Sequence, residues 1–518
     1  MMETSAERAR WWVALGAVAA VLAAGLDSPS GGSITDERLY LGVLADLRQH
    51  AAWFTPSLEG VPDFTKPPLL YWAGRLSVAA FGASLWAARL PVAVSALLLA
   101  LTAARLGRRW GGEAAALRAF LLCGTCLGVL RYGRLFMMDI PLALAVALGI
   151  EAALAAVEQG RPWLLLGAGL AAGAAALLKG PVGPFLVLGV STVLVVARAR
   201  WMLRSPAVPA ALAVVALVGL PWFVGMALVH GRPFVERFLL VEHLGKFGVP
   251  WTLSRAGLLV GSLALFCLPW LPLVRWRPAH ASLRLLAAAW VAVVLGVFLV
   301  PGYKMQQYVV PALVPVLLLA ACTPPRTGAS RTVAFLLGLL GLAALAVLRL
   351  PFGLETRGAL LGEVLLLGLA AALLWRRRID AGAVALAGAA VLAFAVVLPA
   401  VNPAEPPDVP WPEAGRRIHV YRDEPVLLAR LSGRPVHRVT HWNRILEEAR
   451  PGDGVVMPAS DVPALPPELA VALRPVASWP RLRSPILVAN LWRALRTGDL
   501  SPVQEKVALL VVRAPDER

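Results

Sequence analysis

The stretch GGSITDERLYLGVLADLRQHAAWFTPSLEGVPDFTKPPLLYW, residues 31–72, is one long polar interruption early in an otherwise apolar chain. Most connections between elements span a few residues, and longer ones are usually functional or disordered. Apolar residues of its first half recur at helical spacing, at Leu39, Val43, Leu44 and Leu47. We therefore expect a helix on the membrane surface that begins at Asp36 and Glu37. This acidic pair is either an ordinary cap, favoured by the helix dipole, or part of a functional site.

The composition is that of an integral membrane protein. Of 518 residues, 58% are hydrophobic and 15% are charged, and the mean hydropathy is +0.70, whereas soluble domains carry about 25% charged residues. A net charge of +18 would suggest nucleic acid as the partner of a soluble protein. Here the arginines mostly flank apolar segments, so the excess of positive charge in cytoplasmic loops explains them better.

Thirteen apolar segments are candidate spans, although several are shorter than the roughly 20 residues that a span prefers. They lie near 11–26, 86–104, 114–131, 139–157, 163–178, 183–198, 207–229, 256–274, 283–300, 308–322, 332–350, 358–375 and 381–400. The first is either a retained anchor, which we favour, or a cleaved secretory signal. Thirteen spans place the arginine-rich loops and the N-terminus in the cytoplasm. The stretch 31–72 and everything after residue 401 then lie outside.

The C-terminal part has a different composition. A proline-rich linker, VNPAEPPDVPWPEAG at 401–415, precedes strand-like runs at 418–421, 435–440, 454–458 and 507–513. Helical stretches at 424–431 and 442–449 alternate with them. We therefore expect a transmembrane catalytic domain at 1–401 and a small periplasmic α/β domain at 402–518. The latter has no recognisable catalytic motif. The four cysteines lie in or beside apolar segments, so Cys123-x-x-Cys126 suits helix packing better than zinc.

Lysine is rare in this chain. Only five of the 49 basic residues are lysines, and four of these lie at the outer ends of apolar segments: Lys66, Lys179, Lys246 and Lys304. Compact ammonium groups at one membrane edge suit a phosphate, and snorkelling at helix ends is the alternative. Asp139 begins a span on the same side; such an acid is a functional candidate unless it only caps its helix.

These groups form a chemically coherent set on one face, with Asp36, Glu37 and Asp139 as the acids and Lys66, Lys246 and Lys304 as the cations. A carboxylate can take a proton from an attacking hydroxyl or amine. Fixed cations can stabilise the negative charge that develops on a departing phosphate. Together they suggest group transfer from a phosphate-linked lipid.

The order of these motifs resembles the GT-C membrane glycosyltransferases, and within them the group of bacterial aminoarabinose–lipid A transferases and protein O-mannosyltransferases. The resemblance covers about residues 10–320. It is carried by Asp36-Glu37-x-x-Tyr40, FTPSLEGVPDFTKPPLLYW at 54–72, Arg89-Leu90-Pro91, Asp139, Lys179-Gly180-Pro181, Glu242-His243 with Lys246-Phe247, and Lys304 with Tyr308 and Pro311. It implies a GT-C fold of about thirteen transmembrane helices with juxtamembrane helices in the first outer loop.

The resemblance also implies roles for individual residues. Asp36 matches the proposed catalytic base, Glu37 its acidic neighbour and Asp139 a second acid on the same face. Lys66 and Tyr308 match residues that hold the donor phosphate, and we expect Lys246 and Lys304 to join them. The implied donor is a polyprenyl (undecaprenyl) phosphate sugar, which is attacked at its anomeric carbon with inversion and without any nucleotide.

The chain departs from its best-known relatives just before Lys66. Asp63 and Thr65 stand where the aminoarabinose transferases have a tyrosine and a glutamate. That glutamate is associated with a metal, so a divalent metal cofactor and lipid A as acceptor are both left open. His243 is a weak candidate metal ligand, and a structural or donor-site role suits it better.

The sequence thus predicts an inverting glycosyltransferase of the bacterial inner membrane that acts on its periplasmic face. The sugar stays open, and so does the acceptor, which is a lipid, another glycan or a protein. One alternative is a transporter or flippase of a lipid-linked or anionic substrate, which would carry buried ionisable groups near the membrane middle. Another is a non-catalytic protein whose C-terminal part binds a periplasmic partner.

Overall fold

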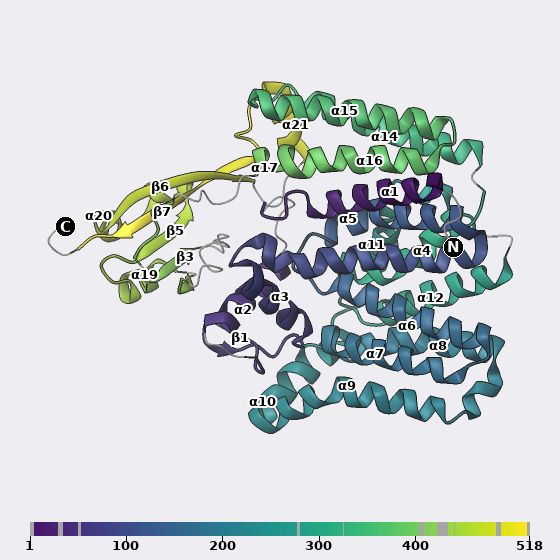
Figure 1. The fold of residues 1–518 in the computed structure, drawn as a ribbon. Coiled ribbons are helices and arrows are strands. Elements are labelled where there is room, and N and C mark those ends of the chain that lie inside the picture. Colours follow the sequence, from purple (N-terminus) through teal and green to yellow (C-terminus); the bar gives the residue numbers. More distant parts are fainter. Residues whose placement is uncertain are drawn as a thin grey trace.

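The computed structural model describes residues 5–28, 35–49, 53–276, 280–324, 326–402, 409–413, 415–421, 434–439, 441–482 and 488–514. Up to residue 402, the described chain is a bundle of long helices packed side by side (Figure 1). The helices of the bundle are α1 (Ser5–Ala23), α3 (Leu69–Phe81), α4 (Leu85–Thr125), α5 (Leu127–Tyr132), α6 (Asp139–Gln159), α7 (Leu165–Lys179), α8 (Val182–Arg198), α9 (Ala207–His230), α10 (Arg232–Val235), α11 (Leu253–Phe266), α12 (Ala281–Leu299), α13 (Leu313–Ala321), α14 (Thr327–Val347), α15 (Leu354–Trp375), α16 (Ile379–Leu392) and α17 (Leu398–Val401).

The apolar helices confirm that this is a membrane protein. In the described part of the chain, eight helices are long and apolar enough to cross a membrane, and four shorter apolar helices accompany them. The first of the eight, α4, contains the predicted span 86–104 and most of the predicted span 114–131, which ends in α5. Its backbone is non-helical at Gly111 and Gly112, where Gly112 has a φ of +60° that favours glycine. The total of thirteen spans stays a prediction.

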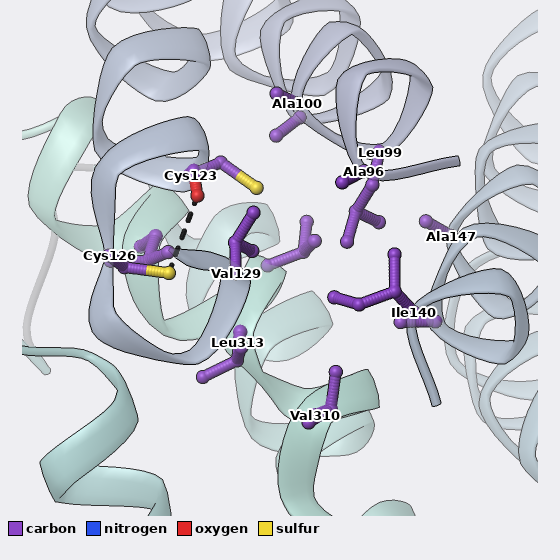
Figure 2. Packing of buried hydrophobic residues seen from close by; sticks show 14 of the residues in the cluster. Ala96, Leu99, Ala100, Cys123, Cys126, Val129, Ile140, Ala147, Val310 and Leu313 are labelled. Atoms are coloured by element: carbon purple, nitrogen blue, oxygen red, sulfur yellow. Dashed lines mark hydrogen bonds between the residues drawn. The ribbon is translucent and has the colours of Figure 1, made fainter. Parts of the chain in front are cut away.

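Small side chains allow the helices of the bundle to pack closely. Alanines such as Ala96, Ala100 and Ala147 are fully buried among larger residues (Figure 2). Cys123 and Cys126 belong to this core as free, buried thiols, and the Cys126 Sγ donates to the Cys123 carbonyl at 3.3 Å. The two cysteines therefore lie in packed apolar surroundings, as expected for helix-packing residues.

The polar stretch after α1 forms a compact unit at one end of the bundle. It contains α2 (Thr35–Gln49) and the antiparallel pair β1 (Ser57–Leu58) and β2 (Val61–Pro62), and it leads into α3. The predicted helix is confirmed, but it is less one-sided than expected because Leu41, Val43, Leu44 and Leu47 are all buried. Figure 1 shows α2 and α3 at the same end of the bundle as the C-terminal sheet.

Within the described residues after 402, the chain forms a five-stranded mixed sheet, which confirms the predicted α/β character. Its strands are β3 (Ile418–Tyr421), β4 (Val436–Val439), β5 (Gly454–Pro458), β6 (Leu473–Leu482) and β7 (Gln504–Val512), in the order β4-β3-β5-β7-β6. β3 is parallel to β4 and β5, whereas β7 is antiparallel to β5 and β6. The helices are α19 (Trp442–Glu448), α20 (Pro467–Ala472) and α21 (Val488–Thr497). Strand β6 was not predicted, and the predicted helix at 424–431 lies outside the described residues. The boundary at residue 401 remains a proposal.

Candidate active site

Two of the three predicted acids, Asp36 and Asp139, lie at the starts of two helices, and each has a polar partner from elsewhere in the chain. Asp36, at the start of α2, accepts a hydrogen bond from Gln307 Nε2 at 3.1 Å. Asp139, at the start of α6, is paired with Lys179 at the end of α7, with Nζ and Oδ1 2.6 Å apart. The N-cap position of α6 is occupied by Met138, and Asp139 is the first residue of the helix. Asp139 is therefore an ion-pair partner and not the helix cap that the sequence also allowed.

The electrostatic environment of Asp36 connects it to the rest of the site. Burial raises the pKa of the Asp36 carboxyl, and Asp139 raises it further. Lys66, Lys179 and Lys246 are close enough to oppose this rise. A carboxylate of raised pKa is a stronger proton acceptor than an exposed aspartate, so the environment suits Asp36 to the role of a general base.

A second group of charges surrounds the carboxylate of Glu242. Lys66 Nζ lies 3.5 Å and Lys246 Nζ 4.0 Å from Glu242 Oε2. Arg237 Nη2 lies 4.0 Å from the other carboxylate oxygen. The structure thus brings together two of the predicted phosphate-binding lysines, although 180 residues of sequence separate them. Cations that converge in this way can bind a phosphate.

Tyr308 lies beside the Lys179 ammonium. The Lys179 Nζ is 4.7 Å from the centre of the Tyr308 ring, and that ring stacks on Phe298 with centroids 4.7 Å apart. Lys179 therefore contacts Asp139 and Tyr308 together, which places Tyr308 next to the acids and cations of the site. The 3₁₀ segment that carries Tyr308, Gln306–Ala312, also contributes Gln307 to Asp36.

The contacts of Glu37 favour a structural role over the catalytic role that the sequence predicted, and that role stays a prediction. Its side chain is fully buried and accepts from Arg89 through both oxygens, at 2.7 Å and 3.0 Å. It also accepts from the Phe136 backbone N–H at 2.8 Å. Arg89 in turn donates to the carbonyls of Leu26 and Ser28. Because both oxygens of this carboxylate are engaged in joining α2 to α4 and to the loop before α6, we propose that Glu37 positions Asp36.

Within the described part of the chain, the contacts of Lys304 do not join it to Lys66 and Lys246, the other lysines predicted to bind the phosphate. Its ammonium donates to the Pro301 carbonyl and lies 5.6 Å from the centre of a Trp251 ring. The neighbouring Tyr303 ring, not Lys304, lies beside Lys246, at 5.9 Å from its Nζ. The expectation that Lys304 holds the phosphate is therefore not supported by its contacts, which serve the connection between α12 and the Tyr308 segment.

The two residues that differ from the best-known relatives form a turn before Lys66. Asp63 Oδ1 accepts from the Thr65 backbone N–H at 3.1 Å, and Asp63 Oδ2 accepts from the Thr65 hydroxyl at 2.9 Å. The Lys66 ammonium donates to the Thr65 carbonyl at 3.2 Å. Asp63 and Thr65 thus order the backbone that presents Lys66.

His243 is fixed by the protein. Its Nδ1 is 2.7 Å from the Phe238 carbonyl, and its ring packs on Phe238 at 4.6 Å. Its other nitrogen faces Gly180, where an added Cβ would lie 2.7 Å from Nε2 and the backbone φ is +67°. Among the described residues, no three His, Cys, Asp or Glu side chains are grouped to hold a metal, and the Thr65 hydroxyl is engaged with Asp63. The contacts of His243 favour the structural role, and its weak candidacy as a metal ligand stays a prediction.

Four residues of the site were not among its predicted members: Lys179, Glu242, Arg237 and Gln307. Two of them belong to quoted motifs, Lys179-Gly180-Pro181 and Glu242-His243, so the signal was present in the sequence. Their partners are far away along the chain, and only the fold identifies them.

Comparison with known proteins gives a consistent result. Residues 65–224 match the family model described as dolichyl-phosphate-mannose-protein mannosyltransferase. An undecaprenyl phosphate-alpha-4-amino-4-deoxy-L-arabinose arabinosyl transferase from Pseudomonas aeruginosa is 30% identical over 414 residues, which cover 71% of this chain and 72% of the relative. A transferase of the same name from Enterobacter sp. is 30% identical over 308 residues. There the match spans only 54% of the relative, about half its length.

The fold is also that of a solved structure. The crystal structure of ArnT from Cupriavidus metallidurans in the apo state has a TM-score of 0.70 at 19% identity, over 97% of this chain and 98% of that one. The chain therefore has the GT-C fold. Within that class, the chain belongs to the family of undecaprenyl phosphate-alpha-4-amino-4-deoxy-L-arabinose arabinosyl transferases.

Proposed function

We propose that this protein transfers a sugar from a polyprenyl phosphate to an acceptor. The observation that carries the proposal is the grouping of Asp36 and Asp139 with Lys66, Lys179 and Lys246 at one end of an apolar bundle. The aspartates supply a proton acceptor, and the lysines bind an anion. A transporter would require neither a base of raised pKa nor cations that match a leaving phosphate.

The proposed reaction is a single displacement with inversion. The acceptor oxygen or nitrogen attacks the anomeric carbon and gives its proton to Asp36. The bond between that carbon and the phosphate oxygen breaks, and its electron pair stays on the oxygen. Lys66 and Lys246 stabilise this developing charge because they are fixed in place before it appears. Asp139 forms an ion pair with Lys179 and thereby keeps this ammonium group in the same site.

The lipid carrier is proposed from the relatives. Their names refer to undecaprenyl phosphate-linked aminoarabinose, and one similar structure is of ArnT bound to undecaprenyl phosphate. We propose the same carrier here. The sugar and the acceptor are separate questions, because Asp63 and Thr65, next to Lys66, stand where the aminoarabinose transferases have other residues. Lipid A, another glycan and a protein are the candidate acceptors.

The proposed location is the inner membrane, with the site and residues 402–518 in the periplasm and the N-terminus in the cytoplasm. The support is the distribution of arginine, which is concentrated in the loops at the other ends of the spans. The proximity of α2, α3 and the C-terminal sheet at one end of the bundle agrees with this orientation (Figure 1).

The test is sugar transfer in membranes that contain Asp36→Asn or Lys66→Ala protein. We expect each to lose at least about 100-fold in rate, the usual scale for a general base or an electrostatic contact to a leaving group. Asp499→Asn is the matched control, because Asp499 is an exposed aspartate of the C-terminal part. Undiminished transfer in both site variants refutes the mechanism. Transport of a labelled lipid without chemical change would favour the flippase.

A further inference from the structure

One acidic residue lies among the cations that are proposed to bind the phosphate. The Glu242 carboxylate is shared by Lys66, Lys246 and Arg237, at 3.5 Å, 4.0 Å and 4.0 Å. The side chains of Glu242 and Lys66 are each only 19% exposed. Because water is partly excluded here, these charge interactions are stronger than the same interactions between fully exposed groups. A phosphate bound by Lys66 and Lys246 therefore has to share its cations with this carboxylate.

The backbone around Glu242 is held in place. Glu242 follows a π-helical turn, Glu236–Val241, and its N–H donates to the Arg237 carbonyl at 3.1 Å. The next residue, His243, is tied to the Phe238 carbonyl and packs against the turn at Gly180. The carboxylate is thus presented to the cations by a packed segment and is part of the site's fixed charge.

The reaction changes the charge that this carboxylate faces. The donor is a phosphodiester with one negative charge. When the bond to the anomeric carbon breaks, the electron pair stays on the phosphate oxygen and the acceptor proton goes to Asp36. The product is a phosphate monoester, and such a group carries about −1.5 to −2 charges at neutral pH. A fixed negative charge repels this product more strongly than it repels the donor.

We propose that Glu242 is a positioning residue that promotes release of the lipid phosphate after sugar transfer. It balances the charge of Lys66 and Lys246 so that they hold the donor but do not retain the more negative product. This inference rests on the proposed function and adds a selectivity between the two lipid phosphates. The competing explanation is that Glu242 only orients Lys66, in which case its removal would weaken phosphate binding.

The experiment compares Glu242→Gln with the wild-type full chain in lipid nanodiscs. The variant keeps the size of the side chain and removes its charge. We expect undecaprenyl phosphate to bind about tenfold more tightly and the donor only about threefold, the scale of one partly screened charge contact. Correspondingly, kcat falls and inhibition by added undecaprenyl phosphate becomes stronger. Glu236→Gln is the control, because Glu236 lies on the same turn but pairs with the exposed Arg232.

Two further variants make the test decisive. Glu242→Asp keeps the charge and should retain the wild-type ratio of product to donor affinity. In a Lys66→Ala background, Glu242→Gln should have a smaller effect, because the two residues act on the same phosphate. Suppose that the wild-type protein binds undecaprenyl phosphate and transfers sugar. If Glu242→Gln then binds undecaprenyl phosphate as tightly as the wild type or more weakly, this inference alone is overturned. A wild-type protein that binds no undecaprenyl phosphate overturns the proposed function with it.

Discussion

The buried pair of Glu37 and Arg89 allows the sharpest prediction about stability. Glu37→Gln keeps the shape of the side chain but removes its charge, which leaves the Arg89 guanidinium buried without a counter-ion. Arg89 is 1% exposed and Glu37 is not exposed at all, so water cannot solvate the charge of Arg89 once its counter-ion is removed. Removal of one partner from a buried ion pair costs about 3–5 kcal/mol. We expect a loss at the lower end of this range, because Arg89 also donates to two backbone carbonyls, at 2.8 Å and 2.6 Å.

The assay is reversible unfolding of the purified protein in mixed micelles, with sugar transfer measured on the same samples. Because the pair pins the helix that carries Asp36, transfer should fall by about 100-fold, as expected for a misplacement of about 1 Å at a reacting group. Asp36→Asn is the comparison: it should lose transfer while its unfolding free energy stays within about 0.5 kcal/mol of wild type. Glu37→Gln protein that unfolds like wild type yet has no activity would refute the positioning role and return Glu37 to the catalytic set.

Three further predictions concern the rest of the site. Because burial raises the pKa of Asp36, which must be deprotonated to act as a base, kcat/KM should fall on acidification at a pH above the ordinary aspartate value of 3.8. Lys246→Met removes a cation that lowers this pKa, so the fall should begin at still higher pH; a pH–rate profile that moves the other way contradicts the assignment. Lys179→Met leaves the buried Asp139 without its ion-pair partner, which should cost about 3 kcal/mol in unfolding experiments, and wild-type stability would show that the pair is dispensable. Asp63→Ala loses the two hydrogen bonds that order its turn, each worth about 1 kcal/mol, and should raise the donor KM several-fold while kcat changes little; an unchanged KM would separate this turn from donor binding.

Local patterns predicted most of the long apolar helices, the helix α2 and four of the five strands of the C-terminal sheet. The apolar periods identified the membrane helices, and the spacing after Asp36 and Glu37 identified α2. Rare lysines at span ends led to Lys66 and Lys246, which the structure brings to one carboxylate. Strand β6 escaped because its run, LRPVASWPRL, contains two prolines and few consecutive apolar residues.

The partners of the charged side chains could not be predicted in this way. Glu37 and Arg89 are 52 residues apart, Asp139 and Lys179 are 40 apart, and Asp36 and Gln307 are 271 apart. The same limitation explains Lys304, which shares its membrane edge with the other lysines but turns to the Pro301 carbonyl and the Trp251 ring.

The sequence by itself determined that this is a membrane protein, and it predicted that acids and lysines at helix ends gather on one side of the membrane. Only the tertiary structure decided that Glu37 is buried against Arg89, that Lys179 pairs with Asp139 and that the Glu242 carboxylate lies between Lys66, Lys246 and Arg237. The physical reason is that hydrophobic periodicity determines the height and the face of a residue on its own helix. Which charges meet depends on how neighbouring helices are rotated and packed against one another, and that depends on contacts between residues far apart in the chain.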